Sequence, residues 1–368
     1  MTTAFSAFDH ACMAQALQLA ERGLYGTDPN PRVGCVIAKQ GNIIGRGFHV
    51  RAGEAHAEVN ALHEAGVAAH GADVFVTLEP CSHTGRTPPC VNALIEARVA
   101  RVVAAMQDPN PKVAGSGFAV LREAGVEVAA GLMESQALAL NPGFVSRMTR
   151  GRPWLRSKLA VSADGRSALA NGVSKWISGP AAREDAQHWR ARSSAILTGS
   201  GTVLADDPAL TVRLDGGTGH WRQPWRVVLD STLRVPATAR VFDAPGQVWL
   251  ATCVSDPQRH RPYLARGAAV LVLPALQGRV DPAALLAVLA ERECNEVLVE
   301  AGAALNGALL NAGLLDELLV YMAPHLLGQG ARGMFDLPTL TDMQARHELV
   351  LKDVRRIGED VRMIFDVK

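Results

Sequence analysis

The chain has 368 residues, a formal net charge of +1 and 48% hydrophobic residues. This apolar content is typical of a globular protein and excludes a disordered or fibrous chain. The length predicts two domains at about 100–200 residues each. The near-neutral charge gives no reason to expect nucleic acid or a membrane surface as a partner. No apolar run approaches the roughly 18–20 residues that cross a bilayer, and the N-terminus lacks a basic start and an apolar signal core. The expected location is therefore the cytoplasm.

The first 147 residues predict alternating helices and short strands. A helix is expected over residues 9–23, where apolar residues recur at helical spacing and Gly23 ends the pattern. Further helices are expected over 56–65, 91–98 and 118–124, and strands over 33–38, 43–44, 73–78, 102–106 and 126–128. Strands that alternate with helices indicate a three-layer α/β/α domain.

Residues 141–153 are rich in Pro and Gly and predict the domain boundary, with one domain over 1–147 and a second over 148–368. The second domain begins with an expected strand over 154–161. Helices are then expected over 180–191, 281–291 and 302–312, and strands over 195–198, 226–230, 247–251, 269–273, 296–300 and 316–322. The pattern indicates a second α/β domain.

Two separated motifs of the first domain combine into a predicted zinc site, with one ion per chain. His56-Ala-Glu58 opens a helix, and Cys81 and Cys90 follow the strand over 73–78. One His and two Cys supply three ligands and leave a fourth position open, as in catalytic zinc sites. Zinc lowers the pKa of water towards about 7. Glu58 is expected to reach that water instead of the ion, and to carry its proton to a ring nitrogen and a leaving amine. His-x-Glu with Pro-Cys…Cys is the signature of zinc deaminases that act on nucleobases.

The remaining histidines and cysteines near these motifs have less specific signals. His83 lies between the two ligand cysteines and is an alternative ligand, but the three-ligand set favours a place for it in the substrate pocket. His49 is close enough in sequence to face the substrate. The other cysteines stand in apolar contexts and are expected to be inert: Cys12, Cys35, Cys253 and Cys294.

The zinc motifs, with Asn30-Pro-Arg-Val-Gly34 and Gly45-Arg-Gly-Phe-His49, resemble the deaminase half of the bifunctional riboflavin-biosynthesis deaminase/reductase family. Eight residues separate Cys81 from Cys90, whereas general nucleobase deaminases have two between their paired cysteines. The longer loop marks the riboflavin branch. The resemblance implies a cytidine-deaminase-like fold, a contact from Asn30 to the pyrimidine, and a Cys81–Cys90 loop over the substrate.

The second domain lacks the G-x-G-x-x-G fingerprint of dinucleotide-binding folds. Residues 297–308 instead predict a strand, a turn of small residues and a helix. The free N–H groups of such a helix N-terminus accept a diphosphate. Small residues are equally typical of a tightly packed α/β turn, so this pattern alone leaves both interpretations open.

Four further segments, 158–166, 174–178, 198–213 and 299–302, resemble the reductase half of the same family, which is similar to dihydrofolate reductase in fold and uses NADPH. The resemblance implies NADPH contacts from Ala160, Trp176, Thr202, Asp206, Ser231, Gly302, Ala303, Ala304, Leu305, Asn306, Gly307 and Ala308. It implies substrate contacts from Ser174, Arg190, Leu210, Arg213 and Glu300. The planar arginine guanidinium suits a substrate phosphate. Lys158 and Asp206 are candidates for proton transfer, with structural ion pairing as the alternative.

The resemblance implies two activities in one chain, a zinc-dependent hydrolase and an NADPH-dependent oxidoreductase. The first half would deaminate 2,5-diamino-6-ribosylamino-4(3H)-pyrimidinone 5′-phosphate. The second would reduce the ribosyl side chain to give 5-amino-6-(5-phosphoribitylamino)uracil. The expected partners are this small-molecule substrate and further copies of the chain.

Two other classes of function stay open at this point. A nucleic-acid-editing deaminase with a fused binding module is disfavoured by the +1 charge and the 5% aromatic content. A structural zinc domain fused to a nucleotide-sensing module would need four protein ligands to the metal.

Overall fold

The computed structural model describes residues 5–83, 88–111, 113–214 and 221–368. The chain divides into two compact units, Met1–Gly151 and Arg152–Lys368. The expected boundary between residues 147 and 148 falls inside helix α6, Pro142–Arg150. Pro142 occupies the first turn of this helix, and Gly151 follows it in the left-handed conformation. The Pro and Gly that suggested a linker are therefore the start and stop of a helix.

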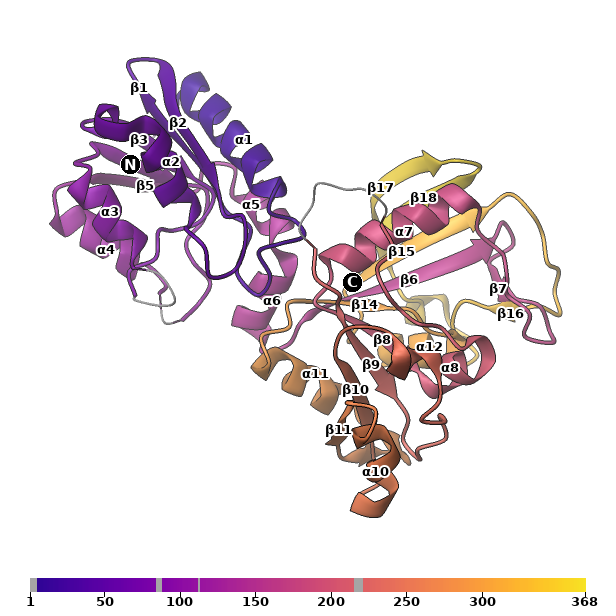
Figure 1. Ribbon diagram of the computed structural model, residues 1–368. Helices are drawn as coiled ribbons and strands as arrows, with labels where there is room; N and C mark the ends of the chain where they lie inside the picture. The colour runs from indigo at the N-terminus through magenta and orange to yellow at the C-terminus, as the bar shows by residue number, and fades with distance from the viewer. Residues whose placement is uncertain (1–4, 84–87, 112, 215–220) are drawn as a thin grey trace. The chain divides into compact units, whose positions relative to one another are not determined.

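The first unit is a five-stranded sheet with helices on both faces, which confirms the expected α/β/α layering (Figure 1). The strand order is β2-β1-β3-β4-β5; β1 is antiparallel to β2 and β3, whereas β3, β4 and β5 are parallel. The strands are β1 Gly34–Lys39, β2 Asn42–Phe48, β3 Asp73–Val76, β4 Arg101–Ala104 and β5 Glu127–Ala130. The helices are α1 Ala7–Glu21, α2 Ala57–Ala65, α3 Cys90–Glu96, α4 Ser116–Glu123, α5 Glu134–Leu140 and α6, with a 3₁₀ turn over Gly66–Ala69.

The two faces of this sheet have separate cores. Buried side chains of α1, α5 and α6 pack on one face, and those of α2, α3 and α4 pack on the other. Helix α2 lies directly on β2 because Gly47 has no side chain: a Cβ there would lie 2.2 Å from the carbonyl oxygen of Ala57. This close approach fixes the start of α2, where His56 and Glu58 lie.

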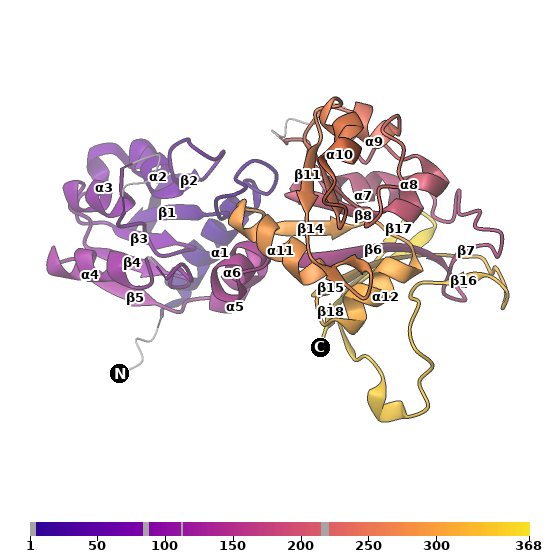
Figure 2. The same ribbon diagram turned by 90° about the horizontal axis from the view of Figure 1, so that it is seen from below.

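The second unit is built on a nine-stranded sheet in the order β11-β10-β9-β8-β14-β6-β15-β18-β17 (Figure 2). Neighbours from β11 to β15 are parallel, and β18 and β17 are antiparallel. The main strands are β6 Trp154–Ser162, β8 Ala195–Gly199, β9 Trp225–Leu229, β10 Val248–Thr252, β11 Ala269–Val272, β14 Glu296–Val299, β15 Glu317–Ala323, β17 Leu349–Ile357 and β18 Asp360–Val367. Short pairs are β7 Arg166–Ala168 with β16 Arg332–Gly333, and β12 Ala275–Leu276 with β13 Arg279–Val280.

Helices cover both faces of this larger sheet. Buried side chains of α11 and α12 pack on one face, and those of α7, α8, α9 and α10 pack on the other. The helices are α7 Pro180–Arg192, α8 Ser200–Asp206, α9 Arg240–Asp243, α10 Pro257–Leu264, α11 Pro282–Glu291 and α12 Ala303–Asn311, with a 3₁₀ turn over Met343–Ala345. This is the expected second α/β domain. Among the described residues, no helix is both long and apolar enough to cross a bilayer.

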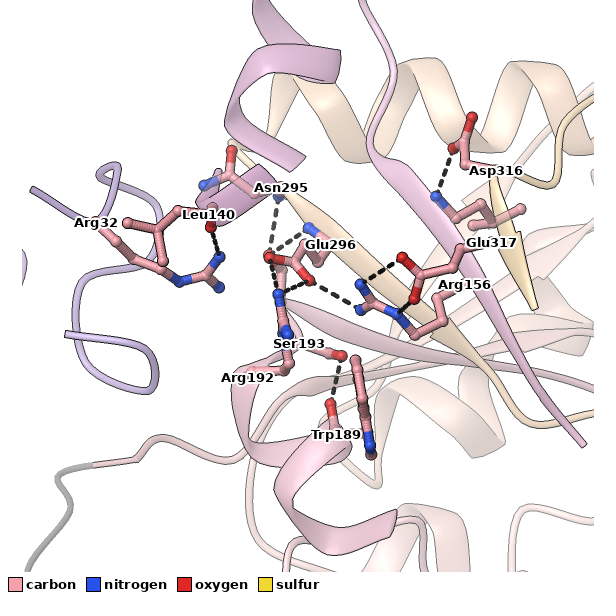
Figure 3. A network of polar contacts seen from close by, with 12 residues as sticks. Arg32, Leu140, Arg156, Trp189, Arg192, Ser193, Asn295, Glu296, Asp316 and Glu317 are labelled. Carbon is pink, nitrogen blue, oxygen red and sulfur yellow. Dashed lines mark hydrogen bonds and ion pairs between the residues drawn. The ribbon is translucent and has the colours of Figure 1, made fainter. Parts of the chain in front are cut away.

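A buried ion network ties together the beginnings of β6, β14 and β15 (Figure 3). Arg156, only 2% exposed, donates to Glu317 and, at 2.9 Å, to Glu296. Its guanidinium lies 4.6 Å from the centroid of the Trp189 ring. Removing one member of a buried ion pair leaves the other charge buried without a partner, so the network stabilises the fold only when all its members are present. The network fixes the strands that carry Lys158 and, at the end of β14, Glu300.

Candidate functional site

His56, Cys81 and Cys90 meet in the first unit. His56 is the N-cap of α2, Cys90 is the first residue of α3, and Cys81 lies in the loop after β3. Their ligand atoms all lie within 4.8 Å of one another. Nδ1 of His56 is 3.2 Å from Sγ of Cys90 and 3.6 Å from Sγ of Cys81. The structure thus brings together the three residues that the sequence assigned to zinc.

The donor set suits zinc. Two sulfurs and one imidazole nitrogen are ligands that zinc prefers, and three protein ligands leave a position open for water. A hydrogen bond with the Cys90 thiol holds the pKa of Cys81 below its usual value in spite of burial, and the His56 ring adds to this effect. The thiolate is the form of cysteine that binds metals.

Glu58 lies in the first turn of α2 and is 3% exposed. It does not belong to the group of clustered ligand atoms. Burial raises the pKa of Glu58 to about 7, and the nearby charge of Cys81 acts in the same direction. A buried carboxyl group beside three metal-type ligands is suited to proton transfer.

Asn30 is linked to this centre through His49. Nδ2 of Asn30 lies 3.1 Å from Nε2 of His49, whose Nδ1 lies 3.1 Å from the carbonyl oxygen of Ala55. That carbonyl can only accept, so Nδ1 carries a proton, and burial lowers the pKa of His49 and favours the neutral ring. The neutral Nε2 then accepts from Asn30 Nδ2, which leaves the Asn30 oxygen for a ligand. The His49 and His56 ring centroids are 5.1 Å apart.

His83 is exposed and lies outside the ligand cluster of the described residues. The loop expected over the substrate includes residues 84–87, which lie outside the part of the chain that the structure describes. Cys12, Cys35 and Cys294 are buried, and burial raises the pKa of Cys12 to about 11 and that of Cys35 well above its usual value. Such thiols are poor nucleophiles.

In the second unit, Glu300 and Arg190 form a two-point ion pair. Nε and Nη2 of Arg190 donate to the two carboxylate oxygens of Glu300 at 2.5 and 2.7 Å. Although burial opposes it, the charge of Arg190 lowers the pKa of Glu300, and Lys158 and Arg213 contribute further. Lys158 is partly exposed; desolvation lowers the pKa of its amine, and its Nζ lies 5.7 Å from the centroid of the Tyr321 ring. The charges of three cationic side chains therefore act on one largely buried carboxylate.

The two arginines expected to hold the phosphate differ in availability. The third guanidinium nitrogen of Arg190, Nη1, donates to the carbonyl oxygen of Thr211 at 2.8 Å, so each of its three nitrogens already bonds a protein group. Arg213 has an exposed side chain, and its backbone N–H bonds Gln187 at 3.0 Å. Leu210, between them in sequence, is 3% exposed. Arg213 is the guanidinium that is open to an incoming anion.

The residues expected to line the cofactor after β14 divide into two groups. Gly302 and Ala304 are exposed at the start of α12, Ala308 is exposed farther along the helix, and Ala303 and Leu305 are partly exposed. Asn306 is buried instead, accepting from Ser157 at 2.7 Å and donating to the carbonyl of Ala301 at 2.9 Å. Gly307 is pressed against the chain at Asp336, where a Cβ would lie 2.0 Å from a carbonyl oxygen. Asn306 and Gly307 hold the turn whose other residues face outwards.

The other expected cofactor residues lie on neighbouring elements. Thr202 and Asp206 are on α8, and Trp176, 69% exposed, stacks on the guanidinium of Arg183 at 4.5 Å. Ala160 lies on β6, Ser174 precedes α7, and Ser231 follows β9. Asp206 pairs with Lys175 at 3.4 Å. The structure thus shows an ion pair for Asp206, and its contact with the cofactor and a part in proton transfer stay predictions.

Arg234 is a residue beside these elements that the sequence did not single out. Its Nη2 donates to Oγ of Ser200, the first residue of α8, at 2.8 Å. A lone arginine after a strand carries no chemical signal by itself. Only the fold brings it next to the turn that contains Thr202.

Comparisons with known proteins cover both units. Residues 6–106 match the family described as the cytidine and deoxycytidylate deaminase zinc-binding region, and residues 153–363 match the RibD C-terminal domain. The chain is 52% identical to riboflavin biosynthesis protein RibD of Escherichia coli (strain K12), over 96% of this chain and 98% of that protein. A solved structure of Acinetobacter baumannii RibD superposes with a TM-score of 0.91 at 45% identity, covering 98% of this chain and 99% of the other.

A more distant solved structure agrees over the same length. The diaminohydroxyphosphoribosylaminopyrimidine deaminase/5-amino-6-(5-phosphoribosylamino)uracil reductase of Thermotoga maritima is 32% identical, with a TM-score of 0.85 and coverage of 98% of this chain and 99% of that one. Agreement in both units, in one chain and in the same order, distinguishes this match from a likeness of one domain alone.

Proposed function

Because this chain belongs to the family of bifunctional riboflavin-biosynthesis deaminase/reductases, we propose that its two units act on one phosphorylated pyrimidine in succession. The first removes the amine of 2,5-diamino-6-ribosylamino-4(3H)-pyrimidinone 5′-phosphate by hydrolysis. The second reduces the ribosyl side chain to give 5-amino-6-(5-phosphoribitylamino)uracil. The single observation that carries the first step is the His56/Cys81/Cys90 cluster with a buried carboxyl group beside it. A nucleic-acid-editing deaminase is not favoured by the comparisons.

His56, Cys81 and Cys90 would hold one zinc ion per chain, and the bound ion would supply the Lewis acidity that makes water a nucleophile near neutral pH. The Asn30 carbonyl oxygen, directed by His49, accepts a hydrogen bond from the pyrimidine and orients the ring. Glu58 takes a proton from the attacking water and passes it to the ring nitrogen. It then takes the proton of the hydroxyl group left on the ring carbon, as that group becomes a carbonyl, and passes this second proton to the leaving amine. The burial of Glu58 excludes bulk water from this transfer.

In the second unit the exposed start of α12 binds the diphosphate of NADPH through backbone N–H groups. Ala160, Trp176, Thr202 and Ser231 contribute contacts along the cofactor. Arg234, held beside α8 by Ser200, supplies a cation for the extra phosphate that distinguishes NADPH from NADH. When bound there, NADPH would supply a hydride for the reduction of the sugar carbon.

The substrate of this second step lies against Ser174, Leu210 and the ion cluster. Arg213 holds its phosphate, and Glu300, fixed by both arms of Arg190, orients the sugar hydroxyls. Lys158 lacks an ion-pair partner within hydrogen-bond distance in the described part of the chain, and its partly desolvated amine delivers a proton to the sugar oxygen when the ring opens.

We also propose that the chain forms a homo-oligomer. Strand β17 is the last strand of its sheet and carries exposed apolar side chains at Leu349, Val350, Leu351 and Val354. Exposed edge strands of this kind pair with other chains unless they are covered. Sedimentation velocity of the purified protein tests this point; a monomer at all concentrations would exclude it.

The two activities should be separable by removing the metal. Dialysis against a chelator, or Cys81→Ser, should abolish ammonia release and leave NADPH oxidation with pre-deaminated substrate largely unchanged. Restoring zinc should recover deamination in the dialysed protein but not in the variant. Loss of both activities in protein that remains folded would contradict a two-site enzyme.

A further inference from the structure

Glu79 is a buried carboxylate that neither proposed reaction uses. It lies in the segment that leads from β3 to Cys81, three residues after the end of the strand, and it is 3% exposed. Oε1 accepts from the backbone N–H groups of Gly117 and Phe118 at 2.8 and 3.3 Å. Oε2 accepts from those of Asp108 and Gly115 at 3.1 and 2.9 Å. One side chain therefore satisfies four backbone donors, all of them in the segment 108–118.

These contacts cap helix α4 from outside its own sequence. The N-cap of α4 is Gly115, which has no side chain to satisfy the free N–H groups of the first turn. A carboxylate at this position meets both the orphan donors and the positive end of the helix dipole. Two further contacts draw the same elements together: Oγ of Ser82 lies 2.7 Å from Oγ of Ser116. A Cβ at Gly117 would lie 2.1 Å from the carbonyl oxygen of Pro80.

The segment that Glu79 holds also borders the proposed metal site. Asp108 is buried and accepts a hydrogen bond from the backbone N–H of Asn110 at 2.8 Å. Its carboxyl group also interacts electrostatically with His83 and Cys81. The turn over 108–110 thus faces the same region as the ligand loop. Glu79 connects the two segments directly, since it precedes Cys81 by two residues and accepts from Asp108.

We propose that Glu79 is a positioning residue of the deaminase: it fixes the distance between the Cys81 loop and the 108–118 segment, and so sets the width of the substrate site. This rests on the proposed zinc centre. Other backbone bonds also hold the ligand loop, including the N–H of Cys90 to Sγ of Cys81 at 3.3 Å. We therefore expect Glu79 to act on substrate binding more than on metal retention.

The test is Glu79→Gln in the full chain, with Glu134→Gln as control. Glutamine keeps the shape of the side chain but has only one acceptor oxygen. Its NH2 group would face two backbone N–H donors, so the two hydrogen bonds on that side of the carboxylate would be lost. Glu134 is an exposed glutamate in the first turn of α5 in the same unit. Displacing a binding group by about 1 Å can cost about 10²-fold. We expect the KM for deamination to rise at least tenfold in Glu79→Gln, with kcat changed less, zinc content as in the unchanged chain, and NADPH oxidation unaffected.

A milder variant guards against loss of folding. Ser116→Ala removes only the hydroxyl contact to Ser82 and should raise the same KM two- to fivefold at unchanged zinc content. If both variants lower the thermal midpoint but leave KM unchanged, Glu79 is a structural helix cap only and the proposal is wrong. If Glu79→Gln loses zinc in proportion to activity, its role is in metal binding, which also overturns the proposal. Failure of the zinc centre itself would appear separately, as a Cys81→Ser variant that retains both zinc and deamination.

Discussion

The ion pair between Arg190 and Glu300 gives a prediction whose size follows from the structure. Glu300→Gln keeps the shape of the side chain and removes its charge. Arg190 and Glu300 have side chains only 12% and 15% exposed. The substitution therefore leaves the Arg190 and Lys158 charges buried without their anion.

Breaking a buried ion pair by removing one partner costs about 3–5 kcal/mol. The glutamine oxygen can still accept one hydrogen bond from Arg190, so we expect the lower end, about 3 kcal/mol. A unit of 150–250 residues loses about 2–4 °C in midpoint per kcal/mol. The expected fall for the second unit is then about 6–12 °C.

The assay can isolate this unit because all six tryptophans lie after residue 152. Unfolding followed by tryptophan fluorescence therefore reports the second unit, and ammonia release reports the first. Arg190→Met combined with Glu300→Gln should lose less stability than the sum of the two single variants, since neither charge is then stranded. Glu291→Gln, an exposed glutamate at the end of α11, is the control.

The pH dependence gives an independent check with a defined sign. The pKa of Glu300 is lower in the folded chain than in the unfolded one. Its contribution to stability is therefore present above the unfolded pKa, about 4.3, and disappears as the pH falls through the folded value. The stability difference between the unchanged chain and Glu300→Gln should shrink below about pH 4. A midpoint shift under about 2 °C at neutral pH, or a difference that grows in acid, would refute the reasoning.

Three further substitutions test the proposed sites. Glu58→Gln should retain zinc by elemental analysis yet lose deamination by at least about 10²-fold, since general acid–base catalysis is removed; loss of the metal would identify Glu58 as a ligand. Arg213→Ala should weaken binding of the reductase substrate by about 10–150-fold, because a charge-assisted contact contributes about 1.5–3 kcal/mol. Deamination should be unchanged, and equal loss of both activities would contradict separate sites. Gly307→Ala should raise the Kd for NADPH at least tenfold, measured by fluorescence titration, because the new Cβ would lie 2.0 Å from the Asp336 carbonyl oxygen and displace α12. Gly330→Ala, which has no neighbour within 4 Å, is the control for that variant, and an unchanged Kd would show that the start of α12 does not bind the cofactor.

From the amino-acid sequence alone, the fold class, most of the element order and a zinc site at His56, Cys81 and Cys90 could be predicted. Short-range signals suffice there: strands and helices follow from period and from Gly or Pro at their ends, as at Gly23 just after α1. His56, Cys81 and Cys90 could be identified because zinc restricts its ligands to a few residue types with recognisable spacing. Helices α5, α8, α9 and α10 and the hairpin of β17 and β18 were not predicted, since their apolar residues follow no clean period over these short spans. Helix α6 was missed because its Pro142 and Gly151 are equally typical of a linker.

Which side chains are available to act depends on the tertiary structure. The sequence gives no reason to distinguish Arg190 from Arg213, yet Glu300 and Thr211, far from Arg190 in the chain, accept a hydrogen bond from each of its three guanidinium nitrogens. Asn306 is predicted to contact the cofactor, and the structure adds that its side-chain oxygen accepts a hydrogen bond from Ser157 on β6. Glu79 carries no signal, because its four partners are backbone N–H groups and any residue can supply those. Residue type restricts what a side chain can do. Long-range packing determines whether its polar atoms already have hydrogen-bond partners within the protein, and therefore whether they can bind a ligand.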